Sequence, residues 1–416
     1  MGTKTLVRLL IALAVLGGIA AILHFSGSGS SVSTVTSSTD KKKVFTDFPI
    51  NDVAKVIIKS KDSAVTLQKG AESWEVAERE GYSAASEPII SMLRDVWDLS
   101  IVQVITIGRS QYGRVNLIAP EDAVTAEEGA TIVTFQGKEG KDLASLWLGK
   151  VYERSENRAS PMGGMAMSEA GRYVKKGTSN SVYLVGDTFD KVATEPAEWI
   201  NKDFFKVEGL KSIEIVSADK KNDWKLVREL ETSDMEFVKA GKDEKLDQAK
   251  VSSMKGAFAN PTIEDVFVGE EAKANKTDDT TFKIATFDGF NYVISVGGKN
   301  DLNELPLTLK VNGKFVEKRK KGEEENEEEA KKADKAFNDN LKSLQDKLAK
   351  EKALEGHVFK VRSYLVDSII KARADLLVVE GEEAGAAPGG QPGGMQLPPG
   401  MKLPPGMQLP GGVTVP

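Results

Sequence analysis

The sequence of 416 residues contains no cysteine and only two histidines. Without cysteine the chain can form no disulfide, no thiolate metal site and no cysteine nucleophile. His24 lies at the end of an apolar run, which leaves His357 as the one histidine for acid–base chemistry. An excess of positive charge is also lacking. The net charge is −6, so we expect no nucleic-acid partner.

The familiar catalytic signatures are missing from the sequence as well. It contains no Gly-x-x-x-x-Gly-Lys phosphate loop, no His-Glu-x-x-His zinc motif, no Gly-x-Ser-x-Gly nucleophile elbow and no EF-hand loop. Carboxylates are plentiful, but they gather in runs such as residues 323–329, which is typical of a solvated helix face. We therefore predict that the protein is not an enzyme and that it has no catalytic residue and no cofactor.

The most apolar stretch lies at the start of the chain. It begins at Leu6, ends at Phe25 and is interrupted by Arg8, a length that can cross a bilayer as a helix. We predict a single-pass anchor over residues 1–25 with the N-terminus in the cytoplasm, because a large domain follows the run and tends to translocate. A cleavable signal peptide is the alternative. Residues 26–44 are rich in Ser, Gly and Thr and predict a flexible linker.

Short β-rich runs separated by turns follow the linker and predict an α+β fold with mainly antiparallel sheets. We also expect helices near residues 88–99 and 189–193. The order of elements then recurs, which predicts two tandem modules, residues 45–205 and 206–383. The repeated segments are 53–60 with 210–217, 74–76 with 235–237, 101–104 with 263–266, 134–137 with 286–289, 144–149 with 293–297, and 182–185 with 358–361.

Two segments fall outside this repeat. Residues 322–355 are dense in Glu and Lys, with an apolar residue every three or four positions, and predict a charged helical insertion in the second module. That helix either lies on its own sheet or packs on a partner. Residues 384–416 repeat Gly, Met, Leu and Pro and predict a disordered tail. Docking of this tail on an apolar groove of a partner is the alternative.

Methionines are the one set of soft ligands in the chain. Met162, Met165 and Met167 fall in a segment, residues 154–171, that we expect to be an enlarged loop, and thioethers at this spacing can hold Cu(I). No histidine or cysteine assists them, and Met with Gly also suits an adaptable contact surface. We therefore predict no metal site and keep these three residues as weak candidates.

A set of short packing and turn motifs runs through the first module. They are Val56-Ile57-Ile58, Leu67, Trp74-Glu75-Val76, Tyr112-Gly113, Leu146-Trp147-Leu148-Gly149, Arg172-Tyr173-Val174 and Val182-Tyr183-Leu184-Val185. In these motifs the chain resembles the bacterial domain-of-unknown-function family 4340, over roughly residues 45–205 and more loosely in the second copy. Arg114 departs from the pattern, because an apolar residue is expected there.

The members of that family are membrane-anchored proteins that are often encoded beside gliding-motility-type ABC transporters. The resemblance implies an extracytoplasmic accessory role at the bacterial inner (cytoplasmic) membrane, and it transfers no active site. We expect an accessory or scaffold protein that binds a partner such as an ABC-type transporter component.

The alternative function is an extracytoplasmic ligand-binding module that holds a glycan, or Cu(I) through its Met-rich segments. Aromatic side chains exposed together on one sheet face would favour this alternative. Scattered, buried tryptophans would favour the accessory role. The tryptophans are Trp74, Trp97, Trp147, Trp199 and Trp224.

Overall fold

The structure is a computed structural model that describes residues 42–378, except 160–164, 219, 221–222, 243, 321 and 323–324. Of residues 154–159 and 165–170 it describes the backbone alone. The predicted anchor, nearly all of the linker, the tail and Met162 lie outside the described residues. Within the described part of the chain, no helix has the length and apolar character needed to cross a membrane.

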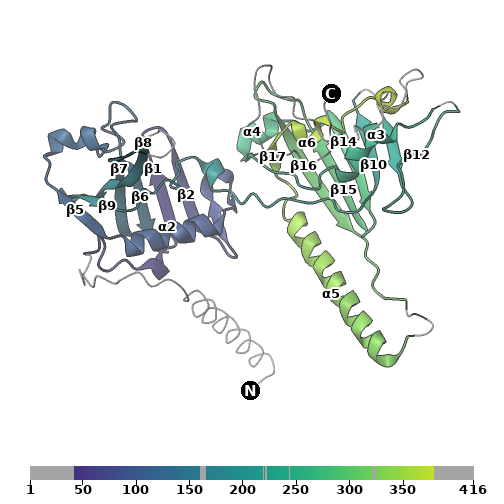
Figure 1. The fold of residues 1–416 in the computed structure, drawn as a ribbon, viewed down its shortest axis with the longest axis horizontal. Helices are drawn as coiled ribbons and strands as arrows, with labels where there is room; N and C mark the ends of the chain where they lie inside the picture. Colours follow the sequence, from purple (N-terminus) through teal and green to yellow (C-terminus); the bar gives the residue numbers. More distant parts are fainter. Residues whose placement is uncertain are drawn as a thin grey trace, which may run out of the picture.

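The first module is built on a nine-stranded sheet in the order β4-β3-β2-β1-β6-β7-β8-β9-β5 (Figure 1). Its strands pair antiparallel throughout, and alternate residues such as Val56 and Ile58 of β1 point into the core. The strands are β1 (Lys55–Lys59), β2 (Ala64–Lys69), β3 (Trp74–Val76), β4 (Tyr82–Ser83), β5 (Ile101–Ile105), β6 (Thr131–Gln136), β7 (Asp142–Ala159), β8 (Met165–Lys176) and β9 (Val182–Val185).

The second module is built on an eight-stranded sheet in the order β12-β11-β10-β14-β15-β16-β17-β13. Apart from β4, each strand has a counterpart at the same place in the first sheet. The α+β class with two mainly antiparallel sheets is therefore confirmed. The strands are β10 (Leu210–Ser217), β11 (Trp224–Val227), β12 (Glu236–Phe237), β13 (Asp265–Phe267), β14 (Thr280–Thr286), β15 (Phe290–Val296), β16 (Glu304–Gly313) and β17 (Val358–Arg362).

Helix α2 (Ser86–Asp98) covers one face of the first sheet (Figure 1). It buries Ile89, Met92, Leu93 and Val96, a spacing that places all four on one side of a helix. The second module has shorter helices at the corresponding place in the chain. Besides α2 and the long helix α5, the described residues form the short helices α3 (Gln248–Ser252), α4 (Gly269–Ala274) and α6 (Tyr364–Asp367). They also form the 3-10 turns η1 (Ile50–Asp52), η2 (Ala77–Arg79), η3 (Arg109–Val115), η4 (Pro196–Glu198), η6 (Ser253–Gly256) and η7 (Arg373–Leu376).

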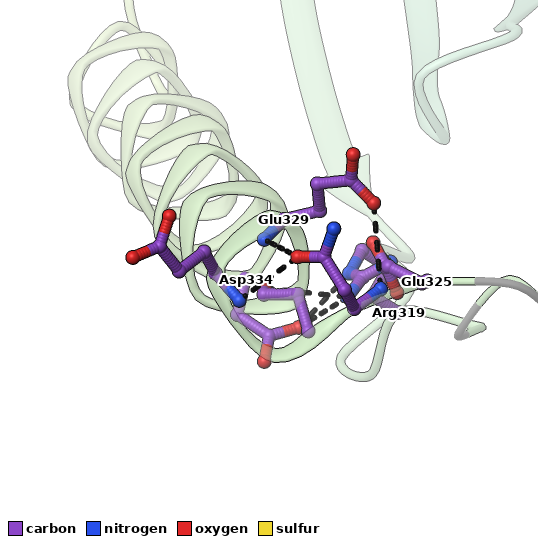
Figure 2. A network of polar contacts seen from close by, with 7 residues as sticks. Arg319, Glu325, Glu329 and Asp334 are labelled. Atoms are coloured by element: carbon purple, nitrogen blue, oxygen red, sulfur yellow. Dashed lines mark hydrogen bonds and ion pairs between the residues drawn. The ribbon is translucent and has the colours of Figure 1, made fainter.

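Helix α5 (Glu327–Lys352) lies between β16 and β17 and extends away from its sheet (Figure 1). A capping box at Asn326 satisfies backbone donors at its start. Near that start, the Arg319 guanidinium pairs with the carboxylates of Glu325 and Asp334 (Figure 2). At its other end, Glu351 is buried and accepts hydrogen bonds from the Tyr292 hydroxyl (2.9 Å) and the Lys206 backbone N–H (3.0 Å). The helix is therefore attached to the second module by its C-terminal end.

The two modules meet along the edge of the first sheet that carries β4. The ring of Tyr82 on β4 lies edge-on to His357 and to Phe359 of β17. Arg79 forms two hydrogen bonds of 2.6 Å with the carboxylate of Asp265 on β13. Buried side chains of both modules join one hydrophobic cluster through this contact.

Two sequence-based expectations were wrong. Residues 189–193 form no helix, because Phe189 has a positive φ of 53° and its N–H donates to the Asp187 carboxylate, which starts a turn instead. Residues 154–171 are not simply an enlarged loop, because β7 and β8 extend through most of them as a long hairpin. Pairing between those strands satisfies their backbone groups without an alternating apolar pattern.

Candidate functional site

The methionine candidates are only partly covered by the structure. Met165 and Met167 lie on β8, where the backbone alone is described, and Met162 lies outside the described residues. The described residues contain no group of three or more histidine, aspartate or glutamate side chains suited to a metal ion. The absence of a metal site at these methionines stays a prediction, which titration of Cu(I) into the purified protein would check.

The tryptophans do not gather at one place. Trp74, Trp199 and Trp224 are buried, and the indole N–H groups of the last two donate to backbone carbonyls. Trp97 is 45% exposed on α2, and Trp147 is half-buried on β7. Three of the five are therefore packing residues, whereas the other two lie on surfaces of the first module.

A second, smaller core lies in the first module, apart from the main hydrophobic cluster. Its buried residues are Tyr112, Leu117, Ala130 and Val182. The segment between β5 and β6, residues 106–130, contributes most of it, and we call this segment the cap. The Tyr112 hydroxyl of η3 donates to the Asn180 carbonyl (3.1 Å), which ties the cap to the turn between β8 and β9.

Gly149 allows the cap to approach the sheet closely. A Cβ at this position would overlap the carbonyl oxygen of Val115 and press on the Leu117 side chain. Only glycine leaves room for backbone to pass at that distance. The motif noted in the sequence at residues 146–149 lies within β7 and is therefore a docking point for the cap.

A groove of about 700 Å³ lies between the cap and the strands β7 and β8. Its lining residues are Ile105, Ile107, Gln111, Arg114, Val115, Lys150, Val151, Tyr152, Glu153 and Tyr173. Six of these ten residues are aliphatic or aromatic and four are polar or charged. The rings of Tyr152 and Tyr173 meet edge to face with centroids 6.0 Å apart. A ligand could pack on the apolar residues and be oriented by the polar ones.

The charges around the groove are mainly positive. Arg114 and Lys150 are its cationic lining residues, and Glu153 is its anionic one. Nearby on β8, Lys175 is only 5% exposed, and its Nζ lies 3.4 Å from the ring centroid of Trp147. Burial lowers the pKa of Lys175, and the nearby Arg109 guanidinium lowers that pKa further. A negatively charged ligand would reduce this repulsion between cations.

Sequence reasoning did not find this groove. Its residues come from β5, the cap, β7 and β8, which are distant in the chain and meet only because the cap folds back over the sheet. One signal was present: Arg114 stands where an apolar residue was expected, and it lines the groove. The lining residues include no pair of groups arranged as nucleophile and base.

The comparisons with known proteins give one match. The protein-family model described as a domain of unknown function, DUF4340, matches residues 162–283. This is the family that the sequence motifs suggested, and the match is confined to residues 162–283. The match covers the end of the first module and the first part of the second, so it includes the motifs at residues 172–174 and 182–185 but not those nearer the N-terminus. Neither the curated proteins nor the solved structures give a match.

Proposed function

We propose that this chain, a member of the DUF4340 family through residues 162–283, is a membrane-anchored accessory protein that binds a partner protein outside the cytoplasm. The apolar run from Leu6 to Phe25 would hold it at the inner membrane. The partner is a protein of that membrane, such as an ABC-type transporter component. The observation that carries the proposal is the groove of the first module, which combines apolar walls with a basic rim.

The groove suits an extended, acidic segment of a partner. An apolar side chain of that segment would pack on Ile105, Ile107 and Tyr173, and its carboxylates would lie near Arg114 and Lys150. Rim charges mainly guide association and select the partner, whereas the apolar contacts provide most of the affinity. An acidic segment with spaced apolar residues meets both requirements.

Charge reversal at the rim tests this proposal. The variant Arg114→Glu/Lys150→Glu, made in the full chain, would be purified from membranes in mild detergent beside the unchanged protein. We expect recovery of the partner to fall roughly tenfold, which corresponds to about 1.4 kcal/mol of binding free energy. The matched control is Lys310→Glu/Lys320→Glu, two exposed lysines of the second module.

Two outcomes would count against this function. Equal recovery of the partner by both double variants would remove the groove from the contact. Failure of any membrane protein to accompany the unchanged chain would remove the accessory role itself.

A glycan ligand is the second candidate, and the pair Tyr152 and Tyr173 favours it. Sugar rings pack on aromatic faces, and Gln111 could donate and accept hydrogen bonds at the same site. Tyr173→Ala should then abolish binding of cell-wall oligosaccharides in a calorimetric titration, whereas the charge reversal should leave binding of neutral oligosaccharides almost unchanged. The reverse pattern would favour the acidic protein segment.

A further inference from the structure

Four exposed apolar side chains of the first module lie on α2 and on β5, the strand that follows it (Figure 1). Ile90 and Trp97 on α2 are 41% and 45% exposed, and Val102 and Val104 on β5 are 64% and 60% exposed. We call these four residues the apolar patch. Large apolar side chains that are exposed near one another mark a contact with another molecule or with a membrane.

The part of the patch on α2 follows one side of the helix. Ile90, Arg94 and Trp97 recur at spacings of four and three residues, which places them next to one another on the helix surface. All three side chains are exposed, whereas the other side of α2 packs on the sheet. This side of α2 therefore presents two apolar side chains with a cation between them.

The part of the patch on β5 lies on the same face of the sheet as α2. Val104 pairs with Tyr183 of β9, which packs against the main hydrophobic cluster that includes α2. The next pair, Ile105 and Val182, belongs to the smaller core under the cap. Because paired residues of two strands point to the same face, Val104 points to the face of α2. Val102 lies at the irregularity in the pairing with β9 and is the most exposed of the four.

The described chain enters the first module beside this patch. Lys43 forms an antiparallel bridge with Ser100, which stands between α2 and β5. The Lys43 Nζ lies 3.8 Å from the centroid of the Trp97 ring and donates to the Asp98 carboxylate at 3.0 Å. This ion pair neutralises the acidic residue that follows Trp97. The chain that leads back to the apolar run, residues 6–25, therefore leaves the module at the patch.

We propose that the apolar patch rests on the surface of the lipid bilayer in which the apolar run is anchored. This inference rests on the anchor of the proposed function. The side chains of the patch suit such a surface. Tryptophan prefers the boundary between lipid and water, valine and isoleucine can enter that boundary, and the neighbouring Arg94 can keep its charge among the headgroups.

The length of the chain before the described residues favours the bilayer over other occupants. Residues 26–41 separate the apolar run from the module, and a flexible chain of this length spans about 22 Å on average. The patch would therefore be held near the membrane at a high effective concentration, so that even a weak contact is populated. A second copy of the chain or a separate protein has no such advantage.

The contact would also orient the groove. Tyr173, which lines the groove, packs in the smaller core, whereas its chain neighbour Val174 packs in the main cluster with α2. Neighbouring residues of a strand point to opposite faces, so the groove lies on the face opposite to α2. With α2 on the bilayer, the groove would face away from the membrane. A partner segment would then come from a part of the partner that lies outside the bilayer.

Quenching of tryptophan fluorescence by brominated lipid tests the contact, because residues 6–25 contain no tryptophan. The full chain would be reconstituted into vesicles of phosphatidylcholine and phosphatidylglycerol whose acyl chains carry bromine near the headgroups. We expect weaker fluorescence than in the same lipids without bromine, and we expect Trp97→Phe to remove most of this quenching. Trp147→Phe is the matched control in the smaller core under the cap, and it should leave the quenching unchanged.

A second variant keeps every tryptophan in place. Val102→Asp/Val104→Asp puts two carboxylates into the patch, and we expect it to remove most of the quenching, because charge is costly to bring into the apolar part of a bilayer. The control Leu302→Asp/Val316→Asp makes the same change at two residues of the second module that are 67% and 70% exposed. We expect the control to leave the quenching unchanged.

Three outcomes would overturn the inference. Quenching that is absent, or that is equal in Trp97→Phe and the unchanged chain, while the protein still floats with the vesicles, would remove the contact and leave the anchor intact. A chain that does not float with the vesicles would contradict the anchor itself, and with it the proposed function. Protection of Trp97 from aqueous iodide that grows with the amount of protein per vesicle, without quenching by bromine, would assign the patch to a second copy of the chain.

Discussion

The two modules share a strand order but differ in what is inserted between the strands. In the first module, the cap between β5 and β6 covers one sheet face and makes the groove. In the second module, the long insertion is α5, placed between β16 and β17. The first module closes the corresponding connection, between β8 and β9, with a short turn. The two sheets are therefore alike in strand order, and the insertions make the surfaces in which the modules differ.

One pair of equivalent positions shows this difference directly. Trp147 and Lys175 face each other on β7 and β8, beside the cap. The facing residues at the same place in the second module are Ser295 and Thr308. Their hydroxyls lie at hydrogen-bonding distance from threonines in the same module, 3.0 and 3.1 Å away. The lysine and the tryptophan are therefore present in the module that has the cap and are replaced by small polar residues in the module that lacks it.

Breaking the contact between the modules should cause the largest loss of stability. Arg79→Ala leaves the Asp265 carboxylate, which is 12% exposed, without its cationic partner. We expect a loss of about 3 kcal/mol in the free energy of unfolding, because an unpaired buried charge is costly. Urea unfolding followed by tryptophan fluorescence measures it. Arg94→Ala, at an exposed site on α2, should change the midpoint little; an equal loss in the two variants would contradict the role of the pair.

Gly149 and Gly297 occupy equivalent positions, and both should be needed for the close approach of another backbone segment to the sheet. A Cβ at Gly149 would overlap the Val115 carbonyl oxygen, and one at Gly297 would overlap that of Lys276. We expect Gly149→Ala and Gly297→Ala each to cost about 2 kcal/mol, because backbone must shift to make room. Thermal unfolding would measure both. Gly256→Ala serves as the control, since its Cβ would meet nothing within 4 Å; a harmless substitution at only one of the pair would break the equivalence.

Because of Lys175, we expect the stability of the first module, and not that of the second, to depend on pH. Its pKa is lowered from the ordinary value of 10.5, mainly by burial, so the folded state binds the proton less well than the unfolded chain. Burying the charged amine therefore costs stability below the pKa of the folded state, and this cost disappears as the pH rises towards 10.5.

We therefore expect Lys175→Met to be more stable than the unchanged protein by about 1 kcal/mol at pH 7, and this gain to shrink at higher pH. Urea unfolding at several pH values measures the difference. Thr308→Val, the matched change in the second module, should show no such dependence on pH. A gain that is constant with pH would contradict the assignment to the lysine charge.

Replacing Asn326, the residue at the N-terminal end of α5, should cause the smallest loss of stability. The Asn326 side chain accepts hydrogen bonds from the backbone N–H groups of Glu328 and Glu329. We expect Asn326→Ala to reduce stability by about 0.5 kcal/mol, because the start of α5 extends away from the sheet and can fray alone. Hydrogen exchange at the first turn of α5 would measure it. Asn340→Ala, at an exposed position inside the helix, should not increase exchange there.

Local sequence patterns were sufficient for the elements that depend on near neighbours. The β-branched run Val56-Ile57-Ile58 predicted β1, and spacing by three and four residues predicted α2 and α5. The repeat was visible because the same strands recur in the same order. The extended hairpin of β7 and β8 escaped prediction, because its pairing depends on the partner strand and not on its own side chains.

The sequence by itself determined the α+β class, the repetition of the sheet and the resemblance to the family whose model matches residues 162–283, because these follow from periodicity and from short motifs along the chain. Tertiary structure alone decided that Arg114 and Tyr173 line one groove, that Lys175 is buried against Trp147, and that β13 is buried whereas Val102 and Val104 of β5 are exposed. These features depend on contacts between residues far apart in the chain. Burial and electrostatics act through distance in space, and the spacing of residues in a sequence does not record that distance.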